Sequence, residues 1–579
     1  MKILLLILSL YTSVLSFAQN NSKIEGFVIN QETKKPIPYV FIYNHTTNKG
    51  TITNNSGYYN LRVNSEKDSI ICNYIGYKPS KINLKISKTN YITYLNEINQ
   101  SLSEVIVTGS DQLFLFKIVL DCKSYKKKKT HNAKAYYELK STINNKTVEV
   151  VENFYNADIT GYDLTKLSLK AGRFGLQFFN NNSFVSLESS RAILNQNLFT
   201  ESNLFPISPL ELKKRKLIKQ FKIKLIKKYT SVKNDTIYVL KIIPKLNNGK
   251  YFTTKIWIDI DKNQIIKINF TNPNSERHPF LAITKLDTLI NVSLNITKTF
   301  KSIKDEIILN HIDFNYDIEY KNRTNQTYLV STSAVIHIYD FKNTFNIPKF
   351  DFFDPKTGDY RKISALPYNS FFWNYHDELK INHQNNINEQ FMKNPKTQTN
   401  QTFFDSNKYS IQGFYQHPYK KWSKKRITFK ETTSKTPYKT NFTTNSLAAS
   451  SYQLKVKLFL DMNTYSDSTN IITSTIFDPF ESYYFFTITK ETKCFINMYF
   501  DILEIERRKL EKEIKNSDKT TVQVEIIYAN SMKRITKIEK DFFMNIKRGT
   551  SKQEMIFWNK YIIRNLGIDN IKFFNVYDD

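Results

Sequence analysis

Between residues 24 and 98, glycines, prolines and short apolar runs recur at intervals that favour short strands joined by tight turns. Residues 37–42 are apolar at both odd and even positions, which is typical of a strand covered on both faces. Pro36 and Pro38 lack amide donors, so we expect this strand to begin at a sheet edge. Residues 54–57, Asn-Asn-Ser-Gly, should form a turn between two more strands. Six or seven strands in roughly 75 residues predict a two-sheet β-sandwich.

This stretch resembles the carboxypeptidase regulatory-like domain, a transthyretin-like sandwich. The resemblance implies an accessory module without catalysis of its own, acting as a folding or docking domain or as a ligand-binding one. Asn54 stands where the family commonly has aspartate, so a cation held at that turn is not expected here. The positions that carry the resemblance are Gly26, Val28, Pro36, Ile37, Pro38, Val40, Gly50, Thr51, Thr53, Gly57, Tyr59, Tyr74, Gly76 and Tyr77.

The N-terminus predicts export. Lys2 is followed by an apolar run over residues 3–10 and then by Ser16-Phe17-Ala18, which is the pattern of a cleaved secretory signal, residues 1–18. The run is short for a bilayer span, and no later stretch approaches 18 apolar residues, so we expect no transmembrane helix in the mature chain. No cysteine lies at the cleavage site, which argues against a lipid anchor there. We expect a location in the periplasm or at the outer membrane.

The formal charge is +31, with 84 basic and 53 acidic side chains. Lysines are scattered apart from residues 126–129 and 213–216, and they accompany abundant asparagine and isoleucine, as codon bias in an AT-rich genome would produce. Nucleic acid is therefore not an expected partner. Adhesion to acidic envelope lipids or glycans remains an alternative.

Residues 102–109 look like the junction that follows such a sandwich in TonB-dependent receptors and in an uncharacterised outer-membrane family. The plug of the receptors does not follow. Residues 111–125 predict a helix with Leu113, Phe116, Leu120 and Cys122 near one face. The lysine run after it and Tyr136-Tyr137 are similar to features of the uncharacterised family.

Residues 133–345 predict a long antiparallel β domain. Ile256, Ile258 and Ile260 share one face, a turn follows, and Ile266, Ile268 and Phe270 return on the same face. The segment 255–259, Lys-Ile-Trp-Ile-Asp, resembles a hairpin of lipoprotein-carrier-like half-barrels, which can hold acyl chains on a concave sheet. The resemblance implies either a carrier or a plain structural half-barrel. Further strands are expected at residues 236–243, 281–290, 307–320 and 329–339.

Residues 346–446 predict a linker region. Phe371-Phe372-Trp373 form an aromatic cluster that either packs against the half-barrel or stacks on sugars. Residues 382–403 and 432–445 are polar and predict a partly ordered linker.

Residues 447–579 predict a small α+β or helical domain. A helix over 501–515 places Ile502, Ile505, Leu510 and Ile514 on one side and the pairs Glu504/Arg508 and Glu511/Lys515 outside. A second helix carries Ile535, Ile538, Phe542 and Ile546; a third carries Met555, Trp558 and Ile562 and ends near Gly567. We expect these stripes to pack on one another, with a coiled-coil partner interface as the alternative.

Motifs of known chemistry are missing. None of the eight histidines has glutamate three residues later, and no Gly-x-Ser-x-Gly elbow, phosphate-binding loop or dinucleotide fingerprint occurs. The tightest metal candidate, His376-Asp377-Glu378 with His383, is flanked by loop-forming asparagines. Cys72, Cys122 and Cys494 fall in three different parts, which favours buried thiols over disulfides. We assign no catalytic, cofactor-binding or metal-binding residue.

The sequence therefore predicts a multidomain, mainly β protein: signal peptide 1–18, sandwich 19–100, linker helix and basic run 101–132, antiparallel half-barrel-like domain 133–345, linker region 346–446 and C-terminal domain 447–579. The expected function is that of a non-enzymatic cell-envelope protein that binds a macromolecule or assists outer-membrane assembly or uptake. Outer-membrane proteins, lipid or glycan are the candidate partners. The alternatives are a periplasmic lipid or lipoprotein carrier and a glycan or peptide hydrolase.

Overall fold

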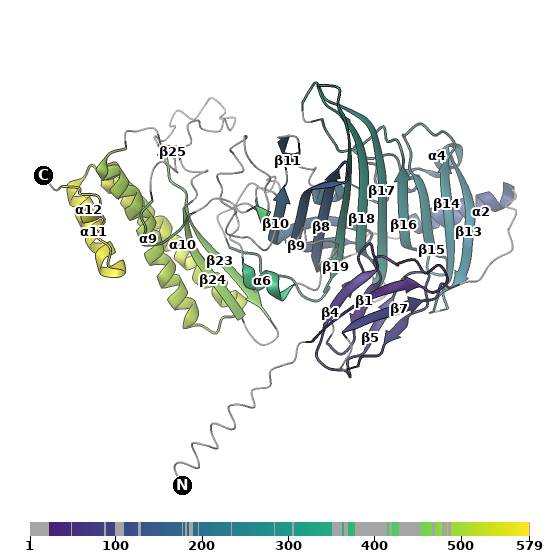
Figure 1. Ribbon diagram of the computed structural model, residues 1–579, viewed down its shortest axis with the longest axis horizontal. Helices are drawn as coiled ribbons and strands as arrows, with labels where there is room; N and C mark the ends of the chain where they lie inside the picture. The colour runs from purple at the N-terminus through teal and green to yellow at the C-terminus, as the bar shows by residue number, and fades with distance from the viewer. Residues whose placement is uncertain are drawn as a thin grey trace, which may run out of the picture.

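The computed structural model shows an N-terminal β-sandwich, a large open β-sheet and a C-terminal part made of helices and a few strands (Figure 1). The mainly β fold class is therefore confirmed, whereas the domain limits stay predictions. The expected signal, the lysines 126–128 and both polar linker stretches lie outside the described residues. The structure describes residues 22–47, 49–85, 89–98, 109–124, 129–176, 178–179, 182–183, 189–194, 196–232, 234–282, 284–303, 306–349, 362–363, 369–376, 414–415, 420–427, 452–465, 469–477, 483–484 and 488–577.

The sandwich has seven strands in two sheets, with strand orders β4-β1-β7 and β3-β2-β5-β6. Alternate side chains of each strand meet between the sheets, where Val28, Ile42 and Leu61 are fully buried. The number of strands agrees with the prediction. The strands are β1 (Ser22–Asn30), β2 (Phe41–Asn44), β3 (Lys49–Ile52), β4 (Tyr58–Val63), β5 (Ile70–Asn73), β6 (Ser80–Ile82) and β7 (Asn90–Leu95).

The expected edge strand beginning near Pro36 is wrong. Residues 37–40 form a turn region in which Tyr39 has a φ of 61°, and β2 starts only at Phe41, between β3 and β5. Both prolines precede β2, so their lack of a backbone N–H removes no hydrogen bond between β2 and its neighbouring strands. The prediction failed because apolar residues at both parities also describe a buried turn.

The Asn54 turn explains how the chain moves from one sheet to the other. The side-chain oxygen of Asn54 accepts hydrogen bonds from the backbone amides of Ser56 and Tyr58, both at 2.9 Å. Gly57 closes the turn with a φ of 73°. The Asn54 oxygen is thus used within its own loop.

The central sheet has eleven strands in the order β13-β14-β15-β16-β17-β18-β19-β8-β9-β10-β20, so β13 and β20 are its terminal strands. Every neighbouring pair is antiparallel. The strands are β8 (Thr130–Ile143), β9 (Lys146–Thr160), β10 (Asp163–Leu176), β13 (Phe221–Thr230), β14 (Thr236–Pro244), β15 (Thr253–Asp259), β16 (Gln264–Asn272), β17 (Thr288–Ile303), β18 (Glu306–Lys321), β19 (Thr327–Tyr339) and β20 (Phe414–Tyr415); a separate short pair is β11 (Phe178–Phe179) with β12 (Asn182–Ser183).

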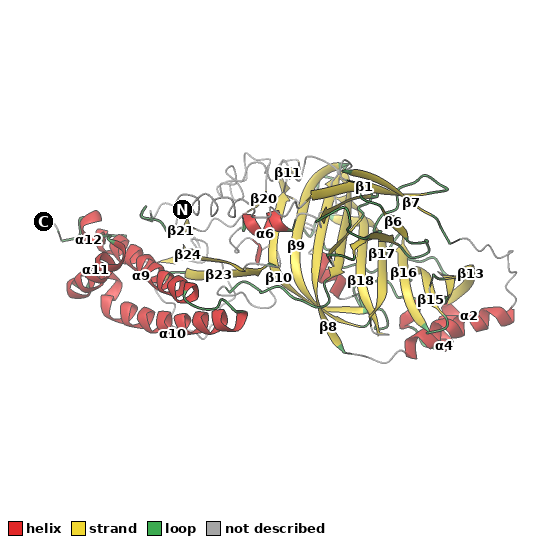
Figure 2. Cartoon of the chain, turned by 90° about the horizontal axis from the view of Figure 1, so that it is seen from below, coloured by secondary structure: helices red, strands yellow, loops and turns green. Residues whose placement is uncertain are grey.

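One face of this sheet, the inner face, is covered by helices of the same chain. Figure 2 shows α2 (Gly109–Asp121) and α4 (Lys214–Gln220) on the side opposite to the sandwich. Phe116 and Val119 of α2 join the buried inner-face residues in one apolar core, together with Ile193 of α3 (Ser189–Leu194). The short 3-10 helix η1 (Cys122–Ser124) directly follows α2 in the sequence, and η2 (Pro209–Glu211) precedes α4.

Three expectations for these segments need correction. Leu113 of α2 is 56% exposed, because the buried stripe is shifted to Leu115, Phe116, Ile118, Val119 and Cys122. A β-bulge after Trp257 places Ile265 in the core and turns Ile266 to the other face. Residues 281–282 and 284–287 are not in a strand, and the strand expected there begins at Thr288.

The C-terminal part packs a hairpin, β23 (Val456–Thr464) with β24 (Thr469–Phe477), against a long helix α9 (Lys490–Lys515). The apolar stripes meet in one core, so the intramolecular packing is confirmed; Ile502, Leu510, Phe542 and Ile562 are 0–1% exposed. The expected Glu504/Arg508 pair is present at 2.9 Å, but Glu504 is buried rather than outside. The other elements are α10 (Thr521–Ile546), η5 (Lys547–Gly549), α11 (Lys552–Leu566), α12 (Asn570–Phe573), β21 (Lys420–Lys421), β22 (Tyr452–Gln453) and β25 (Tyr483–Tyr484). Among the described residues, no helix combines the length and apolarity that a membrane span requires.

Candidate functional site

The outer face of the sheet carries the most unusual group of side chains, where the sandwich docks. Strand register places His311 of β18 opposite His337 of β19, and His337 opposite Tyr136 of β8. The two imidazole centroids are 6.1 Å apart. Tyr39 of the sandwich covers His311, with the ring centroids 4.7 Å apart, and Phe41 lies 6.3 Å from His337.

Both histidines are shielded from solvent, with exposed fractions of 4% for His311 and 1% for His337. Their four ring nitrogens have no hydrogen-bond partner among the described residues. Burial, and then the positive charge of Lys267, lower the pKa of His311 to about 3. Burial, His311 and Lys301 hold the pKa of His337 well below its usual value. Both imidazoles are therefore neutral at pH 7.

Asp313 lies two residues along β18 from His311, on the same face. Burial raises the pKa of Asp313 to about 6, and hydrogen bonds from Asn315 and Tyr39 oppose that shift. The Asn315 amide donates to Asp313 at 2.9 Å. Lys267, which faces the same interface, donates to the Tyr74 hydroxyl of the sandwich at 3.0 Å. The sandwich thus covers a carboxyl group and two imidazoles at once.

A second buried group of charges joins the sheet to the C-terminal part. Lys170 of β10 is 2% exposed and lies 2.5 Å from Asp461 of β23. The other oxygen of Asp461 accepts from the Asn369 amide at 2.9 Å. Asn369 caps the short helix α6 (Ser370–Tyr375), so one carboxylate links three segments of the chain.

The aromatic residues of α6 pack on the outer face next to this ion pair. The ring of Phe154 lies 5.2 Å from Phe372 and 5.3 Å from Trp373. The guanidinium of Arg173, which pairs with Glu152, lies 4.0 Å from the centre of the Trp373 ring. Packing of the cluster against the sheet, rather than stacking on sugars, is therefore confirmed for Phe372 and Trp373.

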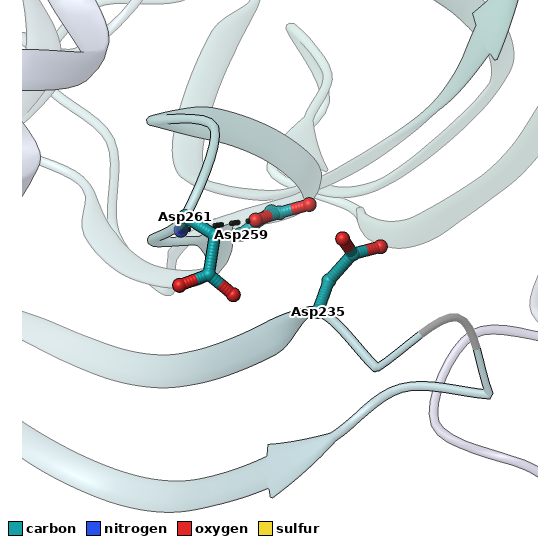
Figure 3. Close-up of side chains that lie close together, drawn as sticks. All are labelled: Asp235, Asp259 and Asp261. Carbon is teal, nitrogen blue, oxygen red and sulfur yellow. Dashed lines mark hydrogen bonds between the residues drawn. The ribbon is translucent and has the colours of Figure 1, made fainter.

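Asp235, Asp259 and Asp261 are a third cluster, with carboxylate oxygens within 4.8 Å of one another (Figure 3). The ammonium of Lys262 lies 2.7 Å from Asp235 and 3.5 Å from Asp259, so a cation of the chain itself already offsets the charge. Asp259 also accepts from the amides of Asp261 and Lys262, at 3.1 and 3.2 Å. These bonds stabilise the β15–β16 turn, and that is the role the geometry supports.

The remaining residues singled out in the sequence are structural or lie outside the described chain. Cys72, Cys122 and Cys494 are buried free thiols, as expected. His376 packs on Phe372, with centroids 4.5 Å apart, whereas residues 377–383 are not among the described residues. The sequence did not point to the histidine pair because the metal-site motifs considered have the short spacings of a helix. A hairpin spacing does predict the pair, since His311 and His337 each lie 13 residues from position 324, the centre of the β18–β19 turn.

A family model described as the CarboxypepD_reg-like domain matches residues 24–107. The assignment of the N-terminal sandwich is thereby confirmed. A comparison with curated proteins found no match. Among solved structures, the chain is similar to an outer membrane lipoprotein-sorting protein domain from Vibrio parahaemolyticus, with 14% identity, 39% of this chain and 89% of that chain covered, and a TM-score of 0.17. A LolA superfamily protein from Nitrosomonas europaea has 11% identity, with 39% and 91% covered and a TM-score of 0.16.

Proposed function

We propose that this chain is a non-enzymatic protein exported to the cell envelope, where the CarboxypepD_reg-like domain, the sheet and the C-terminal part form one binding scaffold. The observation that carries the proposal is the position of the perturbed ionisable groups. His311, His337 and Asp313 lie beneath the sandwich, and Lys170 and Asp461 lie between the sheet and β23. A catalytic acid or base has to reach a substrate, whereas these groups are closed off by the chain itself.

The buried ion pair also explains how the sheet and the C-terminal part hold one orientation. A buried ion pair fixes geometry because either partner without the other is strongly unfavourable. The polar contacts of Lys170 go to Asp461 and to the backbone oxygens of Asn346 and Met462, at 2.7 and 3.1 Å. A scaffold that binds a large partner benefits from such a fixed arrangement.

Subcellular fractionation of the native, untagged protein tests the proposal. We expect the protein in the periplasmic or outer-membrane fraction, shortened by the signal peptide. Recovery of the uncleaved protein in the cytoplasm would contradict the proposal. If the protein is found in the envelope fractions, crosslinking in intact cells, followed by mass spectrometry, would identify outer-membrane proteins or glycans as partners.

A lipid or lipoprotein carrier is the second candidate, and the apolar inner face of the sheet favours it. The chain covers that face itself: the buried Lys298 of β17 donates to the Gln196 carbonyl oxygen at 2.5 Å, and burial lowers its pKa to about 8. Carriage would require the 196–213 segment or α2 to move. Native mass spectrometry of the purified protein decides, because a carrier retains lipid and a scaffold with a packed inner face does not.

A further inference from the structure

One end of the sheet carries large aliphatic side chains in contact with solvent. It is the end where β14, β16 and β18 finish, at the top of the sheet in Figure 1, whereas the sandwich lies toward the opposite end. We call these residues the leucine edge. They are Leu204 (40% exposed), Leu246 (61%), Leu281 (88%), Leu286 (73%), Ile290 (49%) and Leu329 (49%).

The exposure does not arise from a loose loop. Phe280, next to Leu281, is 6% exposed and packs on Tyr316 with ring centroids 4.4 Å apart. At the other end of the same loop, Asp287 accepts from the Tyr320 hydroxyl at 2.6 Å and from the Arg323 amide at 2.8 Å. The chain is fastened next to Leu281, at Phe280, and next to Leu286, at Asp287, so both leucine side chains are held outward.

Hydrogen bonds also join the neighbouring loops into one surface. The amide of Glu276 donates to the Gly249 carbonyl oxygen at 3.2 Å, which ties the 273–287 loop to the 245–252 loop. The Arg323 amide ties the first of these to the β18–β19 turn. The aliphatic residues of separate loops are therefore presented together.

The charge around these residues is mainly positive. Residues 245–252, 273–287 and 321–327 contain six basic and two acidic side chains, and Glu201, near Leu204, adds a third acidic one that lies 3.8 Å from Arg277. Lys245 and Lys285 directly precede Leu246 and Leu286, and both lysines are exposed. Aliphatic residues at loop tips with lysines beside them match the two layers of an anionic membrane surface, where leucine enters the acyl boundary and the ammonium stays with the headgroups.

We propose that the leucine edge docks this protein on an anionic lipid surface, with Leu246, Leu281 and Leu286 inserted and Lys245, Lys285 and Arg323 on the headgroups. The inference is independent of the proposed export, because vesicle binding is measured on the purified protein. Salt should weaken the docking, since the attraction to the headgroups is screened over about 10 Å at 0.1 M ionic strength.

The test is flotation of residues 19–579 with vesicles of phosphatidylcholine, with and without phosphatidylglycerol. Omitting residues 1–18 keeps their apolar run from contributing. We expect binding to the anionic vesicles, a loss of at least about tenfold in affinity for Leu281→Ser/Leu286→Ser, and a similar loss for Lys285→Glu/Arg323→Glu. The matched control is Val522→Ser/Ile526→Ser on α10, where both residues are exposed, at 67% and 55%; it should bind as the wild type does.

Three outcomes would overturn the inference. They are no flotation of the wild type at low salt, equal binding to vesicles without phosphatidylglycerol, and unchanged binding of the leucine variant. Circular dichroism of each variant confirms folding, and substitutions at positions this exposed leave the core intact. Capture of a protein through the same edge, without vesicle binding, would assign the surface to that protein instead.

Discussion

Acidification should destabilise this protein through His311 and His337, and replacing both should remove that sensitivity. An unfolded histidine has a pKa of about 6.5, whereas burial and Lys267 hold that of His311 at about 3 in the fold. The folded-state pKa is lowered, so the unfolded state binds more protons below pH 6.5 and stability falls as the pH falls toward 3. From pH 7 to pH 5 the loss is about 2 kcal/mol for His311, and His337, whose pKa is also lowered, adds to the loss in the same direction.

Asp313 acts in the opposite direction, because its pKa of about 6 in the fold lies above that of an unfolded aspartate. Its protonation between pH 7 and pH 5 returns about 1.4 kcal/mol, which is less than the loss from the two histidines, so a net loss of stability remains. The charged groups Lys267, Lys301 and Glu138 surround this interface as well and are common to all variants.

Urea unfolding at pH 7 and pH 5, followed by tryptophan fluorescence, measures the effect; Trp257 and Trp373 both belong to outer-face clusters of the sheet. His311→Leu/His337→Leu should lose no stability over this range and gain about 1.4 kcal/mol from Asp313. His45→Gln, at an exposed position, is the control and should behave as the wild type does. An equal pH-dependent loss in the double leucine variant and the wild type would refute the reasoning.

Three further predictions concern stability and are read from thermal or urea unfolding. Lys170→Met leaves Asp461 buried without its cation and should cost about 3 to 5 kcal/mol, while Lys170→Met/Asp461→Leu should recover most of the loss; no recovery would mean that packing rather than charge decides. Gly57→Ala should cost about 1 to 3 kcal/mol more than Gly161→Ala, because both glycines have positive φ but only at Gly57 would the new Cβ lie 2.6 Å from the Val28 carbonyl oxygen; equal costs would contradict the steric argument. Trp373→Ala should cost about 3 to 5 kcal/mol and Phe371→Ala, 49% exposed, much less; a reversed order would show that α6 does not pack as described.

The sequence predicted those elements whose two faces differ. Apolar residues alternate over 312–320 because Ile312, Phe314, Tyr316, Ile318 and Tyr320 all face the inner core, and α11 ends at Gly567, whose φ of 69° suits glycine. It failed where a segment is buried all round. The first turns of α9 contain Cys494, Phe495, Ile496 and Met498, which are all buried, so no stripe marked the helix before Asp501.

Most of the candidate site could not be predicted from the sequence, for a different reason. The pairing of His311 with His337 follows from one hairpin turn and could have been read from it. The covering of that pair by Tyr39 joins residues 272 positions apart, and the Lys170–Asp461 contact joins residues 291 positions apart. No local periodicity encodes such contacts, because they depend on how separately folded parts dock.

The terminal strands of an open sheet have backbone groups that could pair with a strand of another molecule. The terminal strand β13 places Lys222 and Lys224 in solvent, and Lys227 and Lys228 follow on the same strand. A second copy that tried to extend the ladder there would bring a like-charged row against this one, and repulsion would work against the pairing. Neutralising these four lysines should therefore increase the tendency of the protein to form fibrils or to precipitate, so the abundance of lysine in this chain has a colloidal use whatever its genomic origin.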